Sequence, residues 1–172
     1  ALAGDIIGRP YEMVNWKSTQ FPLFNDKCKP TDDGILTLAI ASAFLNGTEI
    51  SDESIRLRLQ DQYHRYPAAE YGMNFKMWAK DRISQFLESD GNGSAMRVSP
   101  TAYLSKNLRR VLHYARQSAR PSHSGKDGLV GAQAIAGSIY LALHFKSKDI
   151  IKKFVEENYY KLDFQYEKLL ET

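Results

Sequence analysis

The stretch Pro30-Thr31-Asp32-Asp33-Gly34-Ile35-Leu36-Thr37-Leu38-Ala39-Ile40-Ala41 marks the point where a polar segment becomes an apolar helix. No charged side chain follows until after Asn46-Gly47, which is a plausible helix end. The pattern therefore predicts a helix over residues 35–46. Because this helix is apolar on nearly every side, we expect other helices to bury it.

Three oxygen-bearing side chains, Thr31, Asp32 and Asp33, stand at the start of this helix. A hydroxyl and two carboxylates offer hard oxygen ligands to a divalent cation such as Mg²⁺ or Mn²⁺. Thr and Asp are also preferred N-caps, and acidic residues in a first turn complement the helix dipole. Taken alone, these three residues favour helix capping over a metal site.

Helical periodicity recurs along the rest of the chain, and convincing period-two strands are absent from the sequence. The further helices that we expect are a segment from Ser51-Asp52-Glu53-Ser54 to Tyr66-Pro67, residues 75–87, a segment that begins at Leu108 after Ser105-Lys106-Asn107, a small-residue helix over 129–145, and a helix through 150–155 that Ser147-Lys148-Asp149 caps. The pattern predicts an all-α fold, a compact bundle of several helices.

Composition sets the broad class of protein. A chain of 172 residues with 43% hydrophobic content fits one domain, residues 1–172. The net charge of +3 and the scattered basic residues give no indication of nucleic-acid binding. We expect no membrane span and no signal segment, because no apolar stretch looks long enough. The single cysteine, Cys28, excludes an internal disulfide and suits a reducing, cytoplasmic location.

Four polar segments, expected as loops between the helices, hold the unusual chemistry. They are Gly4-Asp5-Ile6-Ile7-Gly8-Arg9-Pro10-Tyr11-Glu12, Thr31-Asp32-Asp33, Gly91-Asn92-Gly93-Ser94-Ala95-Met96-Arg97 and Ser122-His123. Glycines in the third segment allow the backbone to approach a ligand closely and to present N–H groups to an anion. Since no strand precedes this segment, it is neither a dinucleotide fingerprint nor a Walker phosphate loop.

Taken in this order, the four segments resemble the ADP-ribosylglycohydrolase family, which includes the dinitrogenase-reductase-activating glycohydrolases. That family opens with a glycine-aspartate stretch leading to a glutamate, continues with a Thr-Asp-Asp metal motif and a Gly-Asn-Gly loop followed by Met-Arg, and then has a Thr-His or Ser-His pair before a small-residue helix. Each motif is weak alone, but the ordered set covers almost the whole chain. The resemblance implies an orthogonal helical bundle.

The resemblance also assigns roles to residues. It implies that Thr31, Asp32 and Asp33 bind Mg²⁺ or Mn²⁺, two ions in a complete enzyme, and that Glu12 acts with Asp32 and Asp33 in catalysis. The residues implied to bind substrate are Gly91, Asn92, Gly93, Ser94, Met96 and His123. Simpler alternatives are an exposed acid at Glu12, an ordinary Asn-Gly turn and a solvated loop histidine. We expect Asp5 to be structural and to bind backbone in its own glycine-rich turn. Arg97 could pair with a phosphate or hold a nearby carboxylate, and we favour the carboxylate.

Two departures from the family pattern matter. Gly34 stands where the family often has Thr, a change that we expect to be tolerated. A late Gly-Asp-x-Asp-Thr motif, which supplies further metal ligands in the family, is absent from this sequence. We therefore expect a domain truncated at its C-terminus and an incomplete bundle, with an exposed face on the 129–145 helix that makes an oligomer possible.

The reaction that the resemblance implies is metal-dependent hydrolysis of the bond between the anomeric carbon of ADP-ribose and a protein side chain, or of a related ADP-ribose derivative. The partner would be an ADP-ribosylated protein. A second hypothesis is a catalytically inactive module that binds ADP-ribose or another protein, which the missing late motif favours. A third, an all-α structural domain with capping acids, requires four motif matches by coincidence.

Overall fold

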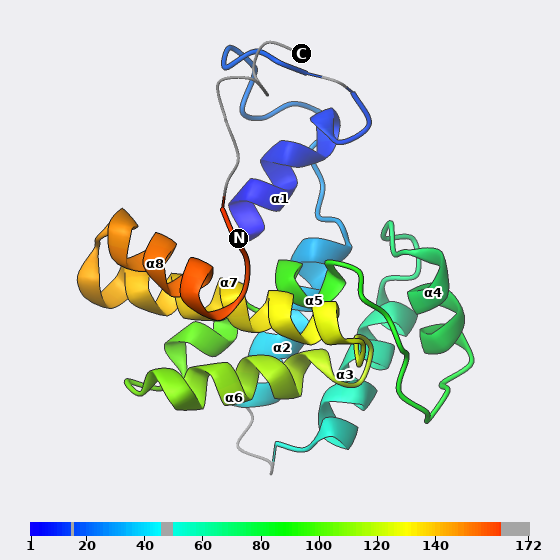
Figure 1. Cartoon of the computed structure of the whole chain (residues 1–172). Helices are drawn as coiled ribbons and strands as arrows, with labels where there is room; N and C mark the ends of the chain where they lie inside the picture. Colours follow the sequence, from blue (N-terminus) through cyan, green and yellow to red (C-terminus); the bar gives the residue numbers. More distant parts are fainter. Residues whose placement is uncertain (15, 46–49, 163–172) are drawn as a thin grey trace.

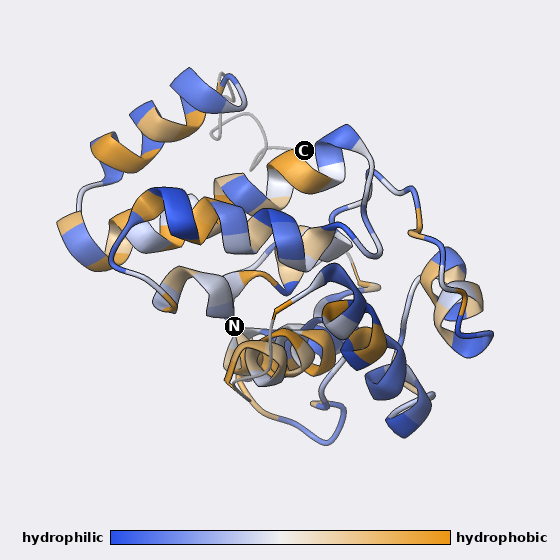
Figure 2. Cartoon of the chain, turned by 90° about the horizontal axis from the view of Figure 1, so that it is seen from below, coloured by the Kyte–Doolittle hydropathy of each residue, from blue (hydrophilic) through white to orange (hydrophobic). Residues whose placement is uncertain are grey.

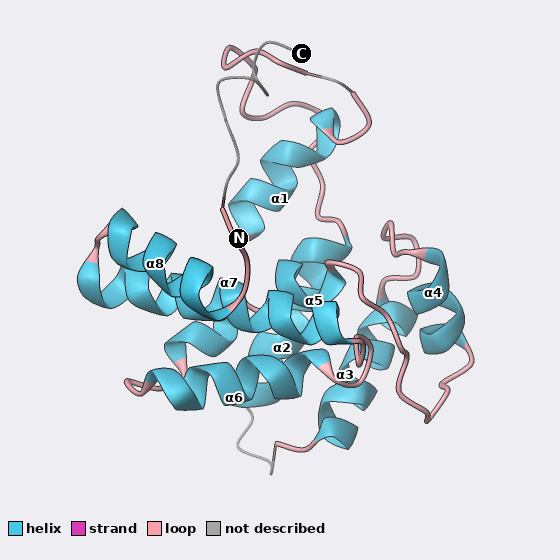
Figure 3. Cartoon of the chain, viewed as in Figure 1, coloured by secondary structure: helices cyan, strands magenta, loops and turns pink. Residues whose placement is uncertain are grey.

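A computed structural model describes residues 1–14, 16–45 and 50–162. Within these ranges the chain is helical, with no strand (Figure 3). The elements are α1 (Leu2–Gly8), the 3₁₀ helix η1 (Arg9–Tyr11), α2 (Asp32–Leu45), α3 (Asp52–Arg65), α4 (Met73–Lys80), α5 (Gly93–Met96), the 3₁₀ helix η2 (Ser99–Tyr103), α6 (Leu108–Ala119), α7 (Lys126–Phe145) and α8 (Lys148–Asn158). The predicted all-α class is confirmed.

Local signals placed most helix starts correctly. Ser51 forms a capping box with Ser54 at the start of α3, and the side chains of Asn107 and Ser147 accept backbone N–H groups at the starts of α6 and α8. Helix α2 begins at Asp32, three residues earlier than predicted. Its predicted end at Asn46-Gly47 lies outside the described residues.

Three predictions about local structure were wrong. The helix expected over 75–87 ends at Lys80, because Arg82 has a φ of 48°, which an α-helix does not accommodate. The first polar segment, residues 4–12, forms helix α1 and η1 rather than a loop. The Gly91–Arg97 segment also contains a short helix, α5.

Two groups of buried apolar residues form the core. One joins α2, α3 and α4 through residues such as Ile40, Ile55 and Trp78. The other joins η2, α6 and α7 and includes Val111 and Ala136. Figure 1 shows α7 beside α6 and between α5 and α8, and α1 standing above this bundle. Polar and apolar residues share most helices, as expected for elements that bury one side (Figure 2).

Helix α7 corrects the expectation that no apolar stretch is long enough to cross a membrane. Its 20 residues include an 18-residue window with a mean hydropathy of 1.4, which meets the requirement of length and composition. In this structure the helix packs against α5, α6, α8 and η2, and 44% of that window is buried. Its apolar composition follows from this central position.

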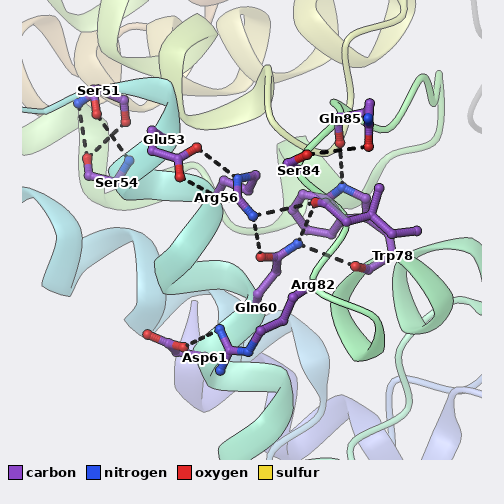
Figure 4. Close-up of polar contacts among 11 residues, drawn as sticks. Ser51, Glu53, Ser54, Arg56, Gln60, Asp61, Trp78, Arg82, Ser84 and Gln85 are labelled. Atoms are coloured by element: carbon purple, nitrogen blue, oxygen red, sulfur yellow. Dashed lines mark hydrogen bonds and ion pairs between the residues drawn. The ribbon is translucent and has the colours of Figure 1, made fainter.

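A buried polar network on α3 holds the irregular segment that follows α4 (Figure 4). The Gln60 amide donates to the carbonyl of Ile83 at 2.9 Å and to that of Trp78 at 3.3 Å, while Arg56 Nη1 donates to Gln60 Oε1 at 2.7 Å. The indole of Trp78 donates to the carbonyl of Gln85 at 2.8 Å. These carbonyls are therefore satisfied without a helix over residues 81–87.

The same segment is also attached to the start of α7. The N–H of Leu87 donates to the carbonyl of Pro121 at 3.0 Å, and the N–H of Ser124 donates to the carbonyl of Leu87 at 3.2 Å. The arrangement brings residues 87–93 beside His123, although more than 30 residues separate them in the sequence.

Candidate functional site

Asp5, on α1, caps the N-terminus of α2 from a distant part of the chain. Its Oδ2 accepts the backbone N–H groups of Thr31 and Gly34, each at 3.0 Å, and its Oδ1 accepts the hydroxyl of Thr31 at 2.5 Å. Two otherwise unpaired N–H groups at the helix start are thereby satisfied. The structural role expected for Asp5 is confirmed, but the backbone that it binds belongs to α2.

Gly34 makes this capping contact possible. A Cβ atom at position 34 would overlap Asp5 Oδ2, the atom that accepts the Gly34 N–H. A Thr at this position, as the family often has, would force the Asp5 carboxylate to move. The glycine is thus matched to the close approach of α1 and α2.

Negative charge gathers at the start of α2. Burial, then the neighbouring Asp33 carboxylate, and to a smaller extent Glu12 and Asp5, together raise the pKa of Asp32 to about 6. The pKa of Asp33 is raised by burial and then by Asp5. Among the described residues, no basic side chain forms an ion pair with Asp32 or Asp33. Neither carboxylate is neutralised by an ion pair in the part of the chain that the structure describes.

A cavity of about 330 Å³ lies between the start of α2, the start of α4, residues 87–97 and His123. Six residues predicted for the site line it: Asp32, Gly91, Asn92, Gly93, Met96 and His123. The sequence analysis missed the wall formed by Gly72, Met73, Asn74 and Phe75, because nothing in a short amphipathic helix marks it as part of a site. The structure thus brings together segments far apart in sequence.

The remaining predicted residues lie elsewhere. Glu12, Thr31 and Asp33 line a second hollow of about 390 Å³ on the α1 side of α2. Asp32 and Asp33 therefore face different hollows, as expected for successive helical residues, which point about 100° apart. Ser94 is buried, and its hydroxyl donates to the carbonyl of Gly128 at 2.6 Å, so the structure uses this side chain to join α5 to α7.

The residues at the start of α2 fit a divalent cation by charge and by donor type. Asp32 and Asp33 supply hard oxygen ligands, and a cation would remove the repulsion that raises their pKa values. Within the described residues, however, no three His, Cys, Asp or Glu side chains lie close enough together to bind one metal ion. Water or further oxygen groups would have to complete any such site.

Arg97 and His123 form the opposite side of the cavity. Arg97 is fully buried; its Nη2 donates to the carbonyl of Ser118 at 3.2 Å and to Ser122 Oγ at 2.6 Å, while its Nε and Nη1 have no hydrogen-bond partner among the described atoms. Burial lowers the pKa of Arg97 to about 9, against the opposing effect of Asp32. The expected pairing of Arg97 with a carboxylate was wrong, because within the described residues its hydrogen-bond partners are a carbonyl and a hydroxyl.

His123 is only 7% exposed, so it is not the solvated loop histidine that the sequence left open. Burial and, after it, the Arg97 charge lower the pKa of its imidazole to about 3. His123 is therefore neutral at pH 7.

Asp90 is a functional neighbour that the sequence analysis missed. Its Oδ1 accepts the backbone N–H of Asp127 at 2.8 Å, in the first turn of α7. A Cβ at Gly125, the residue before this helix, would overlap the Asp90 carboxylate. The contact spans 37 residues, so no local pattern could have revealed it.

Comparison with known proteins supports the family resemblance. The model of the family described as ADP-ribosylglycohydrolase matches residues 1–170. The chain is 28% identical to "ADP-ribosylhydrolase ARH3" of Xenopus tropicalis over 169 residues, a match that covers 83% of this chain and 48% of that protein. Its identity to the mouse protein of the same name is 26% over 173 residues, covering 83% and 47% of the two chains. The chain thus spans less than half the length of these curated relatives.

The family match runs through all four polar segments and through the helices that bring them together. The match therefore includes the paired aspartates at the start of α2 and the Gly-Asn-Gly segment, which lines the same cavity as Asp32. The chain belongs to the ADP-ribosylglycohydrolase family, a family of ADP-ribosyl hydrolases.

Proposed function

We propose that this protein is a metal-dependent hydrolase that removes ADP-ribose from modified protein side chains, or from related ADP-ribose derivatives, by cleaving the glycosidic bond at the anomeric carbon. The observation that carries the proposal is the cavity itself. Asp32, His123 and residues 91–93 line the same cavity. One ligand could meet a carboxylate and hydrogen-bond donors at once.

A cavity that combines a carboxylate with hydrogen-bond donors suits the reaction. Cleavage of a glycosidic bond builds positive charge on the ribose and requires a water molecule held by a base. Carboxylates at the start of α2 would stabilise that charge, while Asn92 and His123 would bind oxygens of the ADP-ribose. Glu12 lies in the neighbouring hollow with Asp33 and would accept a proton from the attacking water.

Members of this family typically use metal ions. In this chain Asp32 and Asp33, with Thr31, would hold Mg²⁺ or Mn²⁺, two ions in the proposed active form. A bound ion supplies Lewis acidity toward a water molecule and toward the ribose hydroxyls. The protein contributes two carboxylates that form no ion pair with a basic side chain among the described residues. They would remain ionised when a cation is bound.

A second candidate is an inactive module that binds ADP-ribose. The observation in its favour is that the described residues contain no group of three metal-binding side chains. Binding through residues 91–97 and His123 would then persist without turnover.

The test is release of ADP-ribose from arginine- and serine-modified proteins by residues 1–172, with Mg²⁺, with Mn²⁺ and with a chelator. Calorimetry with ADP-ribose measures binding separately. Asp32→Asn should abolish turnover, whereas the matched control Asp149→Asn, in the exposed first turn of α8, should not. Binding without turnover would support the inactive module, and the absence of both would overturn both candidates.

A further inference from the structure

A chain of hydrogen bonds leads from the core to the cavity. Arg97 Nη2 donates to Ser122 Oγ at 2.6 Å, and Ser122 Oγ lies 2.9 Å from His123 Nδ1. Arg97 and Ser122 are both 0% exposed, so water does not compete for these contacts. His123 lies at the end of the chain and lines the cavity.

The positions of the hydrogens follow from what each group can do. A guanidinium only donates, so Ser122 Oγ must accept from Arg97. The hydroxyl still has its own hydrogen, and a buried hydroxyl almost always donates it. In the described part of the chain, His123 Nδ1 is the one acceptor that Ser122 Oγ contacts. Nδ1 therefore accepts, and a neutral imidazole must then carry its hydrogen on Nε2.

The Nε2 atom is directed toward the glycine segment. The position that a Cβ would take at Gly93 is 2.9 Å from Nε2, and the corresponding position at Gly91 is 3.8 Å away. No described protein group forms a hydrogen bond with Nε2. The N–H at this position is therefore left for a ligand beside residues 91–93.

We propose that Arg97 and Ser122 are positioning residues that fix His123 in the Nε2–H tautomer, so that the imidazole presents a neutral donor to a ligand oxygen. Under the proposed function, on which the choice of ligand rests, that oxygen belongs to ADP-ribose. A protonated imidazole would place Nδ1–H against the Ser122 hydroxyl, which already accepts from Arg97. The network thus favours a neutral imidazole and places its N–H donor on Nε2, the ring nitrogen nearer the glycine segment.

The tautomer is measured without ligand or metal. In ¹⁵N-histidine-labelled full chain at pH 7, two-bond ¹H–¹⁵N spectra, assigned with His123→Gln, should show an unprotonated Nδ1 and a protonated Nε2. Ser122→Ala should produce exchange between the two tautomers. Ser118→Ala is the matched control, because this buried hydroxyl donates to the carbonyl of Ala115 and does not contact His123.

Protonated Nδ1 in the wild type, or equal behaviour of the two serine variants, would overturn the proposal. Arg97→Lys is a second variant, which should behave like Ser122→Ala if it folds. If it does not fold, the comparison of Ser122→Ala with Ser118→Ala tests the proposal. Calorimetry with ADP-ribose should then show a loss of roughly three- to tenfold for Ser122→Ala, the effect of one misdirected hydrogen bond, and less than about twofold for Ser118→Ala. If ADP-ribose does not bind any variant, the proposed function fails while the tautomer result stands.

Discussion

The starts of α2 and α7 are built in the same way. Each helix begins beside the cavity, and each is capped by an aspartate from a distant segment: Asp5 caps α2 across 29 residues, and Asp90 caps α7 across 37. A glycine, Gly34 or Gly125, makes room for the carboxylate in each case. The distant caps do more than satisfy backbone N–H groups. They tie the polar segments to the helices that they flank.

The two helix starts differ in charge. At α2, Asp32 and Asp33 add to the capping Asp5, and their pKa values rise because of burial and, after it, the neighbouring carboxylates. At α7, the groups that face the cavity are a neutral His123 and the buried Arg97 behind it. The same kind of cap is therefore found beside an acidic wall of the cavity, Asp32, and beside a hydrogen-bond-donor wall, His123 and Arg97. A ligand such as ADP-ribose, with a sugar and a diphosphate, could use both.

The largest expected difference between the two helix starts lies in their caps. Asp5 accepts three hydrogen bonds and Asp90 accepts one from the backbone. Asp5→Ala should therefore reduce the free energy of unfolding by about 3 kcal/mol, and Asp90→Ala by about 1 kcal/mol. Urea denaturation at pH 7 measures both values.

Asp26→Ala, an exposed loop change, is the control and should shift stability by less than about 0.5 kcal/mol. Part of the Asp5 loss is offset because its removal also relieves repulsion on Asp32 and Asp33. Equal losses for Asp5→Ala and Asp90→Ala would show that the number of accepted hydrogen bonds does not distinguish the two caps.

The sequence predicted those elements whose signals are local. Ser51, Asn107 and Ser147 cap their own helices, and each start was predicted within a residue or two. The helix expected over 75–87 failed because its apolar spacing continues past Arg82, whereas the Ile83 carbonyl bonds to Gln60 of α3. A tertiary contact thus replaced the helical one, and periodicity cannot register such a contact.

The site was predicted in the same partial way. The motif order identified the segments that meet at the cavity, including Asp32 and His123. It did not show that Asp33 and Glu12 face another hollow, because the direction of a side chain depends on where the helix begins. Nor could it show that Ser94 is used inside the protein, since its acceptor, the Gly128 carbonyl, lies 34 residues away.

A smaller effect is expected in the pH dependence of stability, to which Asp32 should contribute. The folded pKa of Asp32, about 6, exceeds the unfolded value of 3.8, so the folded state binds more protons between these values. The contribution of Asp32 to stability is therefore fully present below about pH 3.8 and is lost as the pH rises through about 6. Asp32→Asn removes this loss and should stabilise the protein at pH 7 by about 1–2 kcal/mol, a figure already reduced for partial exposure.

Thermal melts of the wild type and Asp32→Asn from pH 3.5 to 8 check this prediction. The two curves should converge at the acidic end, separate between about pH 4 and 6, and stay apart by a constant amount above that range. Mg²⁺ should raise the melting temperature of the wild type at pH 7 more than that of the variant, because the cation binds the ionised carboxylate. A constant difference between the curves at every pH would mean that Asp32 is not the titrating group.

The smallest effect is expected at His123, whose charge in the folded protein should not change between pH 5 and 8. The folded pKa of His123, about 3, lies below the unfolded value of 6.5, so its contribution to stability is complete above about pH 6.5 and is lost as the pH falls toward 3. The His123 ring itself stays neutral throughout the range from 5 to 8. Its ring-proton chemical shift, followed by NMR with His123→Gln for assignment, should therefore show no inflection there, whereas the side-chain carboxyl signal of Asp32 should show one near pH 6. An inflection for His123 between pH 5 and 8 would mean that burial and the Arg97 charge do not keep the imidazole neutral. His123 and Asp32 would then titrate in the same pH range.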